Sequence, residues 1–429
     1  MSWMRFDLGV GVIALGSLDQ LWDGIEDLVD VVEVEPQTLW ETRFGGGKVI
    51  SPEPLAWLRS CGRPLLAHGV GYPVGGMTAP NPEGVLASAD SARDLDAVHW
   101  SEHLAFNVAG EAHAGFLLPP VQTPEAVAAA VRHIRAYHDA FDRPFLVETP
   151  TNYLQPVPGD LSDGEYVAAI AEAADCGILL DLHNIWTNER NGRQSVDDFL
   201  SMIPLDRVWE VHLAGGFETD GYYLDAHVGP IDPELLALAA RVVPTLPRVR
   251  AVIYEAVPAS LAEQGVAGLR EVLTSMHRIV DAPAVAACDG AACDGAASDG
   301  AASGVAVPRQ SGATSATVGR LVSAGTAERE AELVAFTTRA SDLLSTPDPG
   351  ATLMRALTDE ARLSLLVRTH PEILGRLLTV LGRERTAVVL TDFLAASPAS
   401  LWTDEQGTAF AEWLSTRADL ATVLTAYDR

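Results

Sequence analysis

The chain has 429 residues, with 29 lysines and arginines against 58 aspartates and glutamates, so its formal net charge is −29 at pH 7. So acidic a surface repels phosphate backbones unless a basic stripe interrupts it, and the sequence has no such stripe, which argues against a nucleic-acid partner. The first residues lack a basic segment followed by an apolar run, and no apolar stretch is long enough to span a bilayer, so we expect a cytoplasmic protein without a membrane segment.

Chain length and cysteine placement limit the number of domains and the kinds of cysteine site that we expect. A chain of 429 residues exceeds one ordinary core, so we expect one large domain and one smaller domain. The four cysteines are Cys61, Cys176, Cys288 and Cys293, and none of them belongs to a Cys-x-x-Cys pair. This spacing argues against a zinc knuckle, a redox motif and a disulfide framework.

From Phe6 to Ala282, short apolar runs alternate with longer amphipathic stretches in eight repeats, which predicts a (β/α)₈ barrel over residues 1–282. Thr123 before Pro124, and Ser162 with Glu165, have the spacing of helix starts between these runs. The eight predicted strands lie in FDLGVGVIAL from Phe6, VVEVEP from Val31, PLLAHGV from Pro64, AVHWSEHLA from Ala97, PFLVETP from Pro144, GILLDLHN from Gly177, RVWEVHLAG from Arg207 and AVIYEAVP from Ala251.

The composition changes after Ala282, where four imperfect repeats, AACDG, AACDG, AASDG and AASG, lead into a tract of Gly, Ser, Thr and Pro. Such a tract has too little apolar surface to offset chain entropy, so we predict a flexible linker over residues 283–326. Cys288 and Cys293 lie in near-identical Cys-Asp-Gly contexts there, and repeat slippage explains this recurrence simply.

Helical spacing returns beyond the linker and predicts a small all-α domain over residues 327–429. Thr403 and Gln406 have the spacing of a capping box at the start of one of its helices. Such a domain can serve as an oligomerisation or packing module.

Metal-binding side chains recur where the predicted barrel strands end, which is where enzymes with this fold carry their chemistry. Asn184 follows the sixth strand, and an extended segment after the seventh strand supplies two more groups on alternate positions. The nine candidate ligands are His68, His103, Glu148, Asp181, Asn184, His212, Asp225, His227 and Glu255.

Four imidazoles, four carboxylates and one amide without a thiolate suit Fe, Mn or Zn. Nine ligands exceed the needs of one ion and predict a cluster with bridging carboxylates. Any one of these residues has a simpler explanation, because a lone strand-end histidine usually packs in a core and Glu148 or Asp181 could cap a helix. Four carboxylates buried together without cations, however, would each cost several kcal/mol.

The sequence resembles the multinuclear non-heme iron-dependent oxidase family (MNIO), whose barrels share the ligand layout of xylose isomerases and AP endonucleases. The resemblance spans nearly all of Phe6 to Pro258. It rests on HGVG at His68, SEHLAF around His103, LLPP at Leu117, VETPTNYL around Glu148, LLDLHNIW around Asp181, VHLAGG around His212 and LDAHVGP around Asp225.

The resemblance implies two or three iron ions in a mixed-valent Fe(II)/Fe(III) state, with O2 as co-substrate. One ion would be held by His68, His103 and Glu148, a second by Glu148, Asp181, His212 and Glu255, and a third by Asn184, Asp225 and His227. It also implies an oxidoreductase that modifies cysteines of a ribosomally made precursor peptide, in RiPP biosynthesis, often with a separate peptide-delivering protein. The helical domain would then either recruit the peptide to the barrel or serve as an oligomerisation or packing module. The resemblance also suggests that Cys288 and Cys293 are substrates modified in cis, although repeat slippage is the simpler explanation.

Other roles at the site are expected from position beside the ligands. We assign catalytic roles to Glu148, Asp181 and His183, and substrate binding to Asn152, Tyr153, Trp186 and Arg190. This chain departs from many relatives at Thr149 and His183, where they carry Asn, at Gly216, where His is common, and at Gln37, where Glu is common. The departures affect the pocket more than the ligands.

Two alternatives remain open from sequence. Another metal-dependent barrel of the same layout, a sugar isomerase or a phosphodiesterase, would share the ligands, but Asn184 and the acidic charge disfavour a nuclease, and no Lys accompanies the ligand motifs. A non-catalytic peptide-binding protein is the second alternative, and retention of all nine ligands argues against it.

Overall fold

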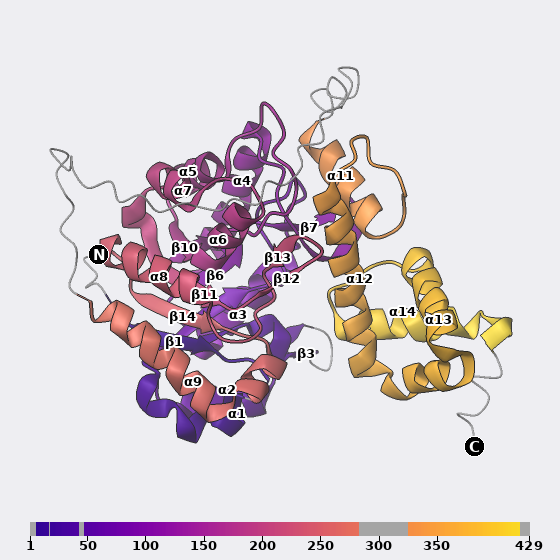
Figure 1. Cartoon of the computed structure of the whole chain (residues 1–429), viewed down its shortest axis with the longest axis horizontal. Helices are drawn as coiled ribbons and strands as arrows, with labels where there is room; N and C mark the ends of the chain where they lie inside the picture. Colours follow the sequence, from indigo (N-terminus) through magenta and orange to yellow (C-terminus); the bar gives the residue numbers. More distant parts are fainter. Residues whose placement is uncertain (1–5, 17, 43–46, 283–324, 421–429) are drawn as a thin grey trace.

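The computed structural model describes residues 6–16, 18–42, 47–282 and 325–420 (Figure 1). Eight parallel strands close into a barrel in the order β1-β14-β11-β10-β9-β6-β5-β2. They are β1 (Gly9–Ile13), β2 (Val31–Val34), β5 (Leu65–Gly69), β6 (Trp100–His103), β9 (Phe145–Glu148), β10 (Gly177–Asp181), β11 (Val208–Ala214) and β14 (Ala251–Glu255). Each predicted strand is present, so the predicted barrel is confirmed.

Helices follow the strands and cover the outside of the barrel, as Figure 1 shows. They are α1 (Leu18–Leu21), α2 (Pro52–Ser60), α3 (Pro82–Leu95), α4 (Pro124–Ala140), α5 (Asp163–Ala174), α6 (Leu182–Arg190), α7 (Val196–Met202), α8 (Pro233–Val242) and α9 (Pro258–Val280). Among the described residues, no helix has both the length and the apolar character that a bilayer crossing requires.

Three short antiparallel hairpins interrupt this pattern, and each follows the end of a barrel strand. They are β3 (Trp40–Thr42) with β4 (Lys48–Ile50), β7 (Phe106–Ala109) with β8 (Ala112–Leu118), and β12 (Phe217–Thr219) with β13 (Tyr222–Leu224). Because the carboxyl ends of parallel strands share one end of the barrel, the hairpins surround its mouth.

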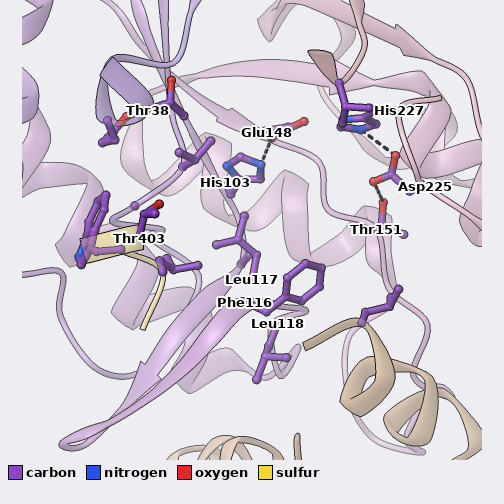
Figure 2. Close-up of a pocket in the computed structure, with 18 of the residues that line it drawn as sticks. Thr38, His103, Phe116, Leu117, Leu118, Glu148, Thr151, Asp225, His227 and Thr403 are labelled. Atoms are coloured by element: carbon purple, nitrogen blue, oxygen red, sulfur yellow. Dashed lines mark hydrogen bonds and ion pairs between the residues drawn. The ribbon is translucent and has the colours of Figure 1, made fainter. Parts of the chain in front are cut away.

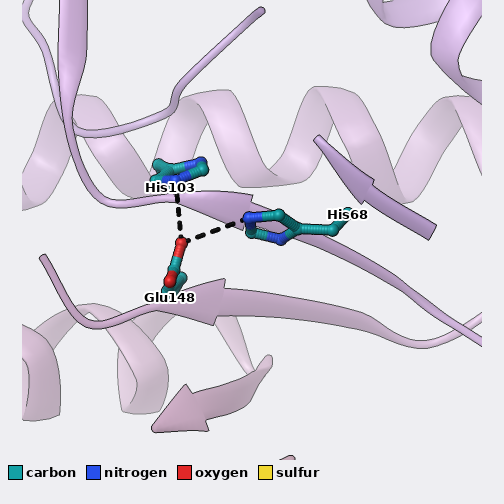
Figure 3. A group of neighbouring side chains, drawn as sticks. All are labelled: His68, His103 and Glu148. Atoms are coloured by element: carbon teal, nitrogen blue, oxygen red, sulfur yellow. Dashed lines mark ion pairs between the residues drawn. The ribbon is translucent and has the colours of Figure 1, made fainter. Parts of the chain in front are cut away.

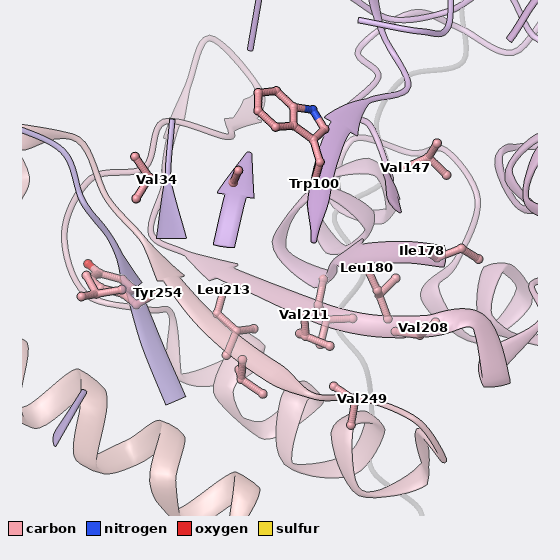
Figure 4. Close-up of a cluster of buried hydrophobic side chains, with 14 of the residues drawn as sticks. Val34, Trp100, Val147, Ile178, Leu180, Val208, Val211, Leu213, Val249 and Tyr254 are labelled. Carbon is pink, nitrogen blue, oxygen red and sulfur yellow. The ribbon is translucent and has the colours of Figure 1, made fainter. Parts of the chain in front are cut away.

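The outer face of the strands makes the main core. Val34, Val147, Leu180 and Val211 are fully buried between strands and helices, as the cluster in Figure 4 shows. Successive strand residues point to opposite faces, so their neighbours point into the barrel. Burial on both faces explains the nearly continuous apolar runs in the sequence.

The inner face changes character along the strands. A small apolar cluster of Leu8, Val31, Leu66, Ala251 and Ile253 fills the amino-terminal end of the barrel. Two residues further along, the inward positions are polar in three of these strands: Glu33, His68 and Glu255. Since inward positions recur every second residue, the sequence fills the amino-terminal end of the barrel with apolar side chains and the carboxyl-terminal end with polar ones.

Two of the three predicted helix caps are confirmed. The Thr123 side chain accepts a hydrogen bond from the Ala126 backbone, and Ser162 and Glu165 form a complete capping box. The third prediction is wrong: α14 begins at Thr403, with no side-chain cap hydrogen bond. The Gln406 side chain instead accepts a hydrogen bond from buried Arg362 at 3.2 Å, so tertiary contact overrides the local motif.

The described carboxyl-terminal region is helical, with α11 (Thr326–Thr337), α12 (Pro349–Thr369), α13 (Pro371–Ala396) and α14 (Thr403–Ser415). In Figure 1, α11 and α12 lie beside the β7–β8 hairpin. Leu333 and Val334 of α11 and Met354 of α12 share one apolar cluster with Phe106 and Leu118 of that hairpin. A second cluster lies within the helical region itself, among Leu366, Leu377, Phe393, Phe410 and Leu414.

Polar contacts hold α11 to the barrel. The buried Glu330 carboxylate accepts hydrogen bonds from the Met77 backbone N–H at 2.9 and 3.0 Å, and burial raises the pKa of this carboxyl to about 7. Arg329 pairs with Asp160 at 2.6 Å. The first two helices of this region are therefore packed on the barrel. The predicted boundaries at residues 282 and 326 stay a prediction, and Cys288 and Cys293 lie outside the described residues.

The contact between α11 and the barrel can be tested by truncating one buried side chain. Leu333 is 6% exposed in the shared cluster, so Leu333→Ala should lower the free energy of unfolding by about 2 to 5 kcal/mol through lost burial and a cavity. Leu343 is 79% exposed, and Leu343→Ala is the matched control with little expected effect. Urea unfolding measures both, and equal stability of the two variants would contradict the packing.

Candidate metal centre

The nine predicted ligands meet at the carboxyl end of the barrel in three overlapping groups. Seven of them stand at or just after the ends of β5, β6, β9, β10, β11 and β14. Adjacent strand ends are in register, with His103 opposite Glu148 and Asp181 opposite His212. Asp225 and His227 come from the segment after β13, which the β12–β13 hairpin returns over the barrel mouth.

The first group consists of His68, His103 and Glu148. Figure 3 shows both imidazoles directed at one carboxylate oxygen. Glu148 Oε2 lies 3.4 Å from His68 Nε2 and 3.0 Å from His103 Nε2, and the two imidazole rings are 4.6 Å apart. Three donor atoms from three neighbouring strands therefore face one small volume.

The second group consists of Glu148, Asp181, His212 and Glu255, whose donor atoms all lie within 4.8 Å of one another. His212 Nδ1 is 3.1 Å from Glu255 Oε2 and 3.8 Å from Glu148 Oε1. Asp181 directs one oxygen to the Asn184 backbone N–H at 2.8 Å and leaves the other free for this volume. All four side chains are buried.

The third group contains Asp225 and His227, with His227 Nε2 at 2.8 Å from Asp225 Oδ1. His183 Nδ1 reaches the same oxygen at 3.0 Å. The Asn184 side-chain amide donates a hydrogen bond to the Thr149 carbonyl at 3.1 Å. The Thr151 hydroxyl contacts both Asn184 Oδ1 and Asp225 Oδ2. The predicted trio of Asn184, Asp225 and His227 thus lies together, with His183 beside it.

The backbone at His227 supports a constrained role for this residue. Its φ is 54°, in the left-handed region that residues other than glycine rarely occupy. Such a conformation costs about 1 to 3 kcal/mol and persists only where the surroundings impose it. The His227 carbonyl accepts a hydrogen bond from the Val257 N–H at 3.0 Å, which ties this strained turn to the segment after β14.

Two carboxylates link the groups. Glu148 presents Oε2 to His68 and His103 and Oε1 to His212. Glu255 presents Oε2 to His212 and Oε1 to His227, the latter at 3.3 Å from His227 Nδ1. Each oxygen pair is thus divided between neighbouring groups, which is the arrangement of carboxylates that bridge ions.

Burial and mutual charge shift the pKa values of the side chains at the centre away from their usual range. Burial and the nearby Glu148 and Asp225 carboxylates raise the pKa of Asp181 well above its usual value. Burial alone would lower the pKa of His103, but the Glu148 carboxylate raises it well above the usual value. Protons on histidines therefore balance part of the negative charge, and cations that bind there would displace those protons.

Hydrogen bonds prepare His68 and His103 as ligands. His103 Nδ1 lies 2.8 Å from the Gly69 carbonyl oxygen, which can only accept, so Nδ1 carries a hydrogen and Nε2 is the nitrogen whose lone pair a cation could use. His68 Nδ1 lies 2.8 Å from Ser101 Oγ, and the Ser101 hydroxyl in turn reaches the Ala67 carbonyl at 3.5 Å. Burial lowers the pKa of His68 to about 4, which keeps this imidazole neutral.

The donor set fits metal ions. Buried polar atoms nearly always have hydrogen-bond partners. Five buried side-chain atoms in these groups have no hydrogen-bond partner among the described residues: His68 Nε2, Glu148 Oε2, Asp181 Oδ2, His212 Nε2 and His227 Nε2. Each of the three groups contains at least one of these atoms. Nitrogen and oxygen donors without thiolate suit Fe, Mn or Zn.

A pocket of about 840 Å³ opens directly above the centre. His103, Glu148 and Asp225 line its floor, as Figure 2 shows. Hairpin residues such as Trp40 and Phe116 form one part of the wall. The carboxyl-terminal region forms another part, with Met354, Leu357, Arg368, Thr369, Leu401, Trp402, Thr403 and Asp404.

Of the four residues predicted to bind substrate, Tyr153 alone lines this pocket, and its hydroxyl accepts a hydrogen bond from the Asp225 backbone at 2.9 Å. Asn152 Oδ1 accepts a hydrogen bond from the Leu154 N–H at 3.0 Å. The Arg190 guanidinium lies 4.8 Å from the centre of the Trp186 ring and pairs with Glu234 at 3.2 Å. Asn152, Trp186 and Arg190 are engaged in local contacts, and substrate binding by them stays a prediction.

The departures from relatives have local explanations. Thr149 receives a hydrogen bond from the Asp181 N–H at 2.9 Å and so joins β9 to β10 beneath the centre. A side chain at Gly216 would start 2.2 Å from the Leu224 carbonyl oxygen and 2.8 Å from the Tyr223 ring, so no histidine fits there. Gln37 is buried in the pocket lining, with Nε2 at 3.3 Å from Ser88 Oγ.

Sequence reasoning missed several polar groups beside the centre. Burial raises the pKa of Glu33 to about 8 and that of Glu35 to about 7, with Glu255 among the carboxylates that add to both effects. Glu210 is fully buried one inward position before His212, and Thr151 contacts the third group. The signal for the glutamates was available, because they interrupt apolar strands at alternate, inward positions.

A closed parallel barrel with linked groups of His, Asp and Glu side chains at its carboxyl end defines a TIM-barrel protein whose barrel mouth could hold metal. The model of one family, described as RiPP precursor modification enzyme MbnB/TglH/ChrH, matches residues 17–257. The chain belongs to this family of enzymes, which modify ribosomally synthesised precursor peptides.

Two curated relatives each match a little under half of this chain. A UPF0276 protein from Chromobacterium violaceum is 31% identical over 214 residues, which is 48% of this chain and 75% of that protein. A UPF0276 protein from Vibrio vulnificus is 31% identical over 178 residues, which is 41% of this chain and 61% of that protein. A solved xylose isomerase domain protein from Planctomyces limnophilus aligns at 14% identity with a TM-score of 0.43, covering 65% of this chain and 99% of that one.

Removing metal should destabilise the protein, because the buried carboxylates lose their counter-charges. A ligand that binds only the folded state at 100 times its dissociation constant contributes about 2.7 kcal/mol. We expect a chelator to lower the melting temperature and an added divalent transition metal to restore it, with metal analysis of each sample as the control. Complete loss of metal with an unchanged melting temperature would contradict this account of the centre.

Proposed function

We propose that the chain is a multinuclear non-heme iron-dependent oxidase that uses O2 to modify cysteine residues of a ribosomally synthesised precursor peptide. The observation that carries the proposal is the sharing of Glu148 and Glu255 between three groups of buried donors. Membership of a RiPP precursor modification family supports a peptide substrate over the sugar or nucleic acid of the other barrel enzymes considered.

The ligands divide among three positions. His68, His103 and Glu148 would hold one ion, and Glu148, Asp181, His212 and Glu255 a second. Asn184, Asp225 and His227 would hold a third, with His183 orienting Asp225 through its hydrogen bond. The nitrogen and oxygen donors suit iron, and the resemblance to iron oxidases favours iron over zinc or manganese.

Iron ions at adjacent positions would supply Lewis acidity for a thiolate and one-electron redox chemistry toward O2. The chain's own contribution is geometry, because strands in register fix the donors before substrate enters. Glu148 and Asp181 are held in place because each ends a barrel strand. The hydrogen bond from His183 orients Asp225 at the pocket floor. The apolar wall around Phe116 excludes water from the reacting cysteine.

The pocket suits a segment of peptide. Its volume of about 840 Å³ is in the range of sites that bury drug-sized ligands, and it extends from the ligands to the carboxyl-terminal helices. The Trp402 ring stacks on Trp40 across the pocket mouth, with ring centres 6.1 Å apart. We infer that the helical region contacts the peptide, either instead of or together with a separate delivery protein. A cytoplasmic location stays a prediction.

Glu148→Gln tests the centre most directly, because this side chain contributes to two positions. The amide keeps the volume but removes the charge and one acceptor oxygen, so we expect iron content and peptide modification to fall to background while circular dichroism stays unchanged. A short Cys-containing reading frame among the neighbouring genes supplies the peptide, and mass spectrometry reads the modification. Unchanged turnover in a folded variant would rule out the proposed site.

Arg368 tests whether the helical region contacts the peptide. This exposed arginine lines the outer pocket, whereas Arg383 on α13 is exposed and outside the pocket lining. We expect Arg368→Ala to raise the KM for the peptide about twofold to fivefold, the size of an exposed charge contact, with kcat nearly unchanged. Arg383→Ala is the control and should leave KM as it is. An equal KM in both variants would argue against peptide contact at Arg368.

A further inference from the structure

A second layer of buried polar groups lies beneath the metal ligands and meets His212 from below. It consists of Glu33 on β2, Glu210 on β11 and His99 just before β6, each 1% exposed or less. His212 Nε2 lies 2.9 Å from Glu33 Oε2 and 3.9 Å from Glu210 Oε1. His99 Nε2 lies 2.8 Å from Glu210 Oε2. Neither the sequence motifs nor the family resemblance gives these three residues a role.

The two nitrogens of His212 face different surroundings. Nδ1 faces Glu255 and Glu148 in the second ligand group, whereas Nε2 faces the carboxylates below. A neutral imidazole has one N–H and one lone pair, and only the lone pair can bind an ion. His212 can therefore serve as a ligand through Nδ1 only if its hydrogen stays on Nε2.

His68 and His103 meet the same requirement in the opposite orientation. Both point Nε2 at the ligand group and place Nδ1 on a neutral acceptor, Ser101 Oγ or the Gly69 carbonyl. His212 is turned the other way round, so its acceptor must come from the inside of the barrel. The carboxylate at 2.9 Å occupies that place.

Glu33 is the acceptor rather than Glu210. Glu210 Oε2 is already occupied by His99 at 2.8 Å, and Glu210 Oε1 is 3.9 Å from His212 Nε2, beyond hydrogen-bond range. Neither oxygen of Glu33 has a hydrogen-bond partner among the described residues, and His212 Nε2 has none either. The two side chains approach each other as an ion pair at 2.9 Å. The contact to His212 is thus the available use of this fully buried carboxylate.

The geometry points to Glu33 as the positioning residue that holds the Nε2 hydrogen of His212 and so directs the Nδ1 lone pair at the second metal position. The inference rests on the proposed metal centre. A carboxylate behind a histidine ligand fixes its ring and tautomer and makes it more basic, and loss of such a partner weakens metal binding about tenfold to hundredfold. Glu33 therefore contributes to the affinity of the second ion without touching it.

The same atoms could instead enclose a further cation between Glu33, Glu210 and His212, whose donors lie within 4.8 Å of one another. That arrangement would require His212 to bind ions through both nitrogens and so to lose its hydrogen. It would also place a cation beside a Glu210 carboxylate that already pairs with His99. The positioning role needs neither condition.

Cobalt binding tests the inference without reference to turnover. Full-length metal-free protein is titrated with Co²⁺, with calorimetry for affinity and stoichiometry and ligand-field absorption for coordination. We expect Glu33→Leu, which removes the acceptor at similar volume, to weaken one Co²⁺ site about tenfold to hundredfold and leave the other sites intact. Glu210→Gln is the matched control, equally buried but outside hydrogen-bond range, and should weaken binding far less.

Nuclear magnetic resonance of ¹⁵N-histidine in the Zn²⁺-loaded wild-type protein gives a second readout that needs no folded Glu33 variant. We expect the His212 signals, assigned with His212→Gln, to show a metal-bound Nδ1 and a protonated Nε2. A metal-bound Nε2, an additional ion lost in both glutamate variants, or wild-type affinity in Glu33→Leu would each overturn the inference. Glu148→Gln in parallel separates the two proposals, because intact Co²⁺ binding in that variant would instead refute the metal centre itself.

Discussion

Glu148 and Glu255 each direct their two oxygens at different groups of donors, and this division joins three sets of ligands into one centre. Both carboxylates are nearly fully buried, where an ionised group without a counter-charge is strongly destabilising. The surrounding histidines can supply that counter-charge only by taking protons, which removes their lone pairs. Metal ions satisfy both requirements at once, so the electrostatics of the barrel mouth and its ligand geometry favour the same occupant.

The barrel and the ligand positions could be predicted because both follow from short-range patterns. Parallel strands buried on two faces give apolar runs, and a polar residue that ends such a run must lie at the barrel mouth. His103 and Glu148, although 45 positions apart in the sequence, are opposite one another in adjacent strands. Closing the barrel therefore brings together residues that the sequence already identifies as polar side chains at strand ends.

What the sequence could not provide depends on side-chain contacts between distant segments. Arg190 and Trp186 stand beside a ligand motif, yet they pack on each other and on Tyr223. The capping motif at Thr403 fails because Arg362, 44 positions away from Gln406, takes the glutamine side chain. Glu33 interrupts an apolar strand, but its contact with His212 exists only because β11 places that histidine against it. Each outcome is set by tertiary neighbours that no local pattern encodes.

Close packing places the helical region at the pocket. At Gly71, just after β5, a side chain would start 2.8 Å from the Trp402 ring, so the absence of one lets that ring reach Trp40 and Tyr72 at the mouth. Glu330 and Arg329 hold α11 on the barrel at another point. The strand ends therefore supply the buried donor atoms, and later segments of the chain, between Met354 and Asp404, supply part of the wall above them. In the proposed function, metal binding and peptide selection would then depend on different parts of the sequence, so the wall could change without disturbing the metal-binding side chains.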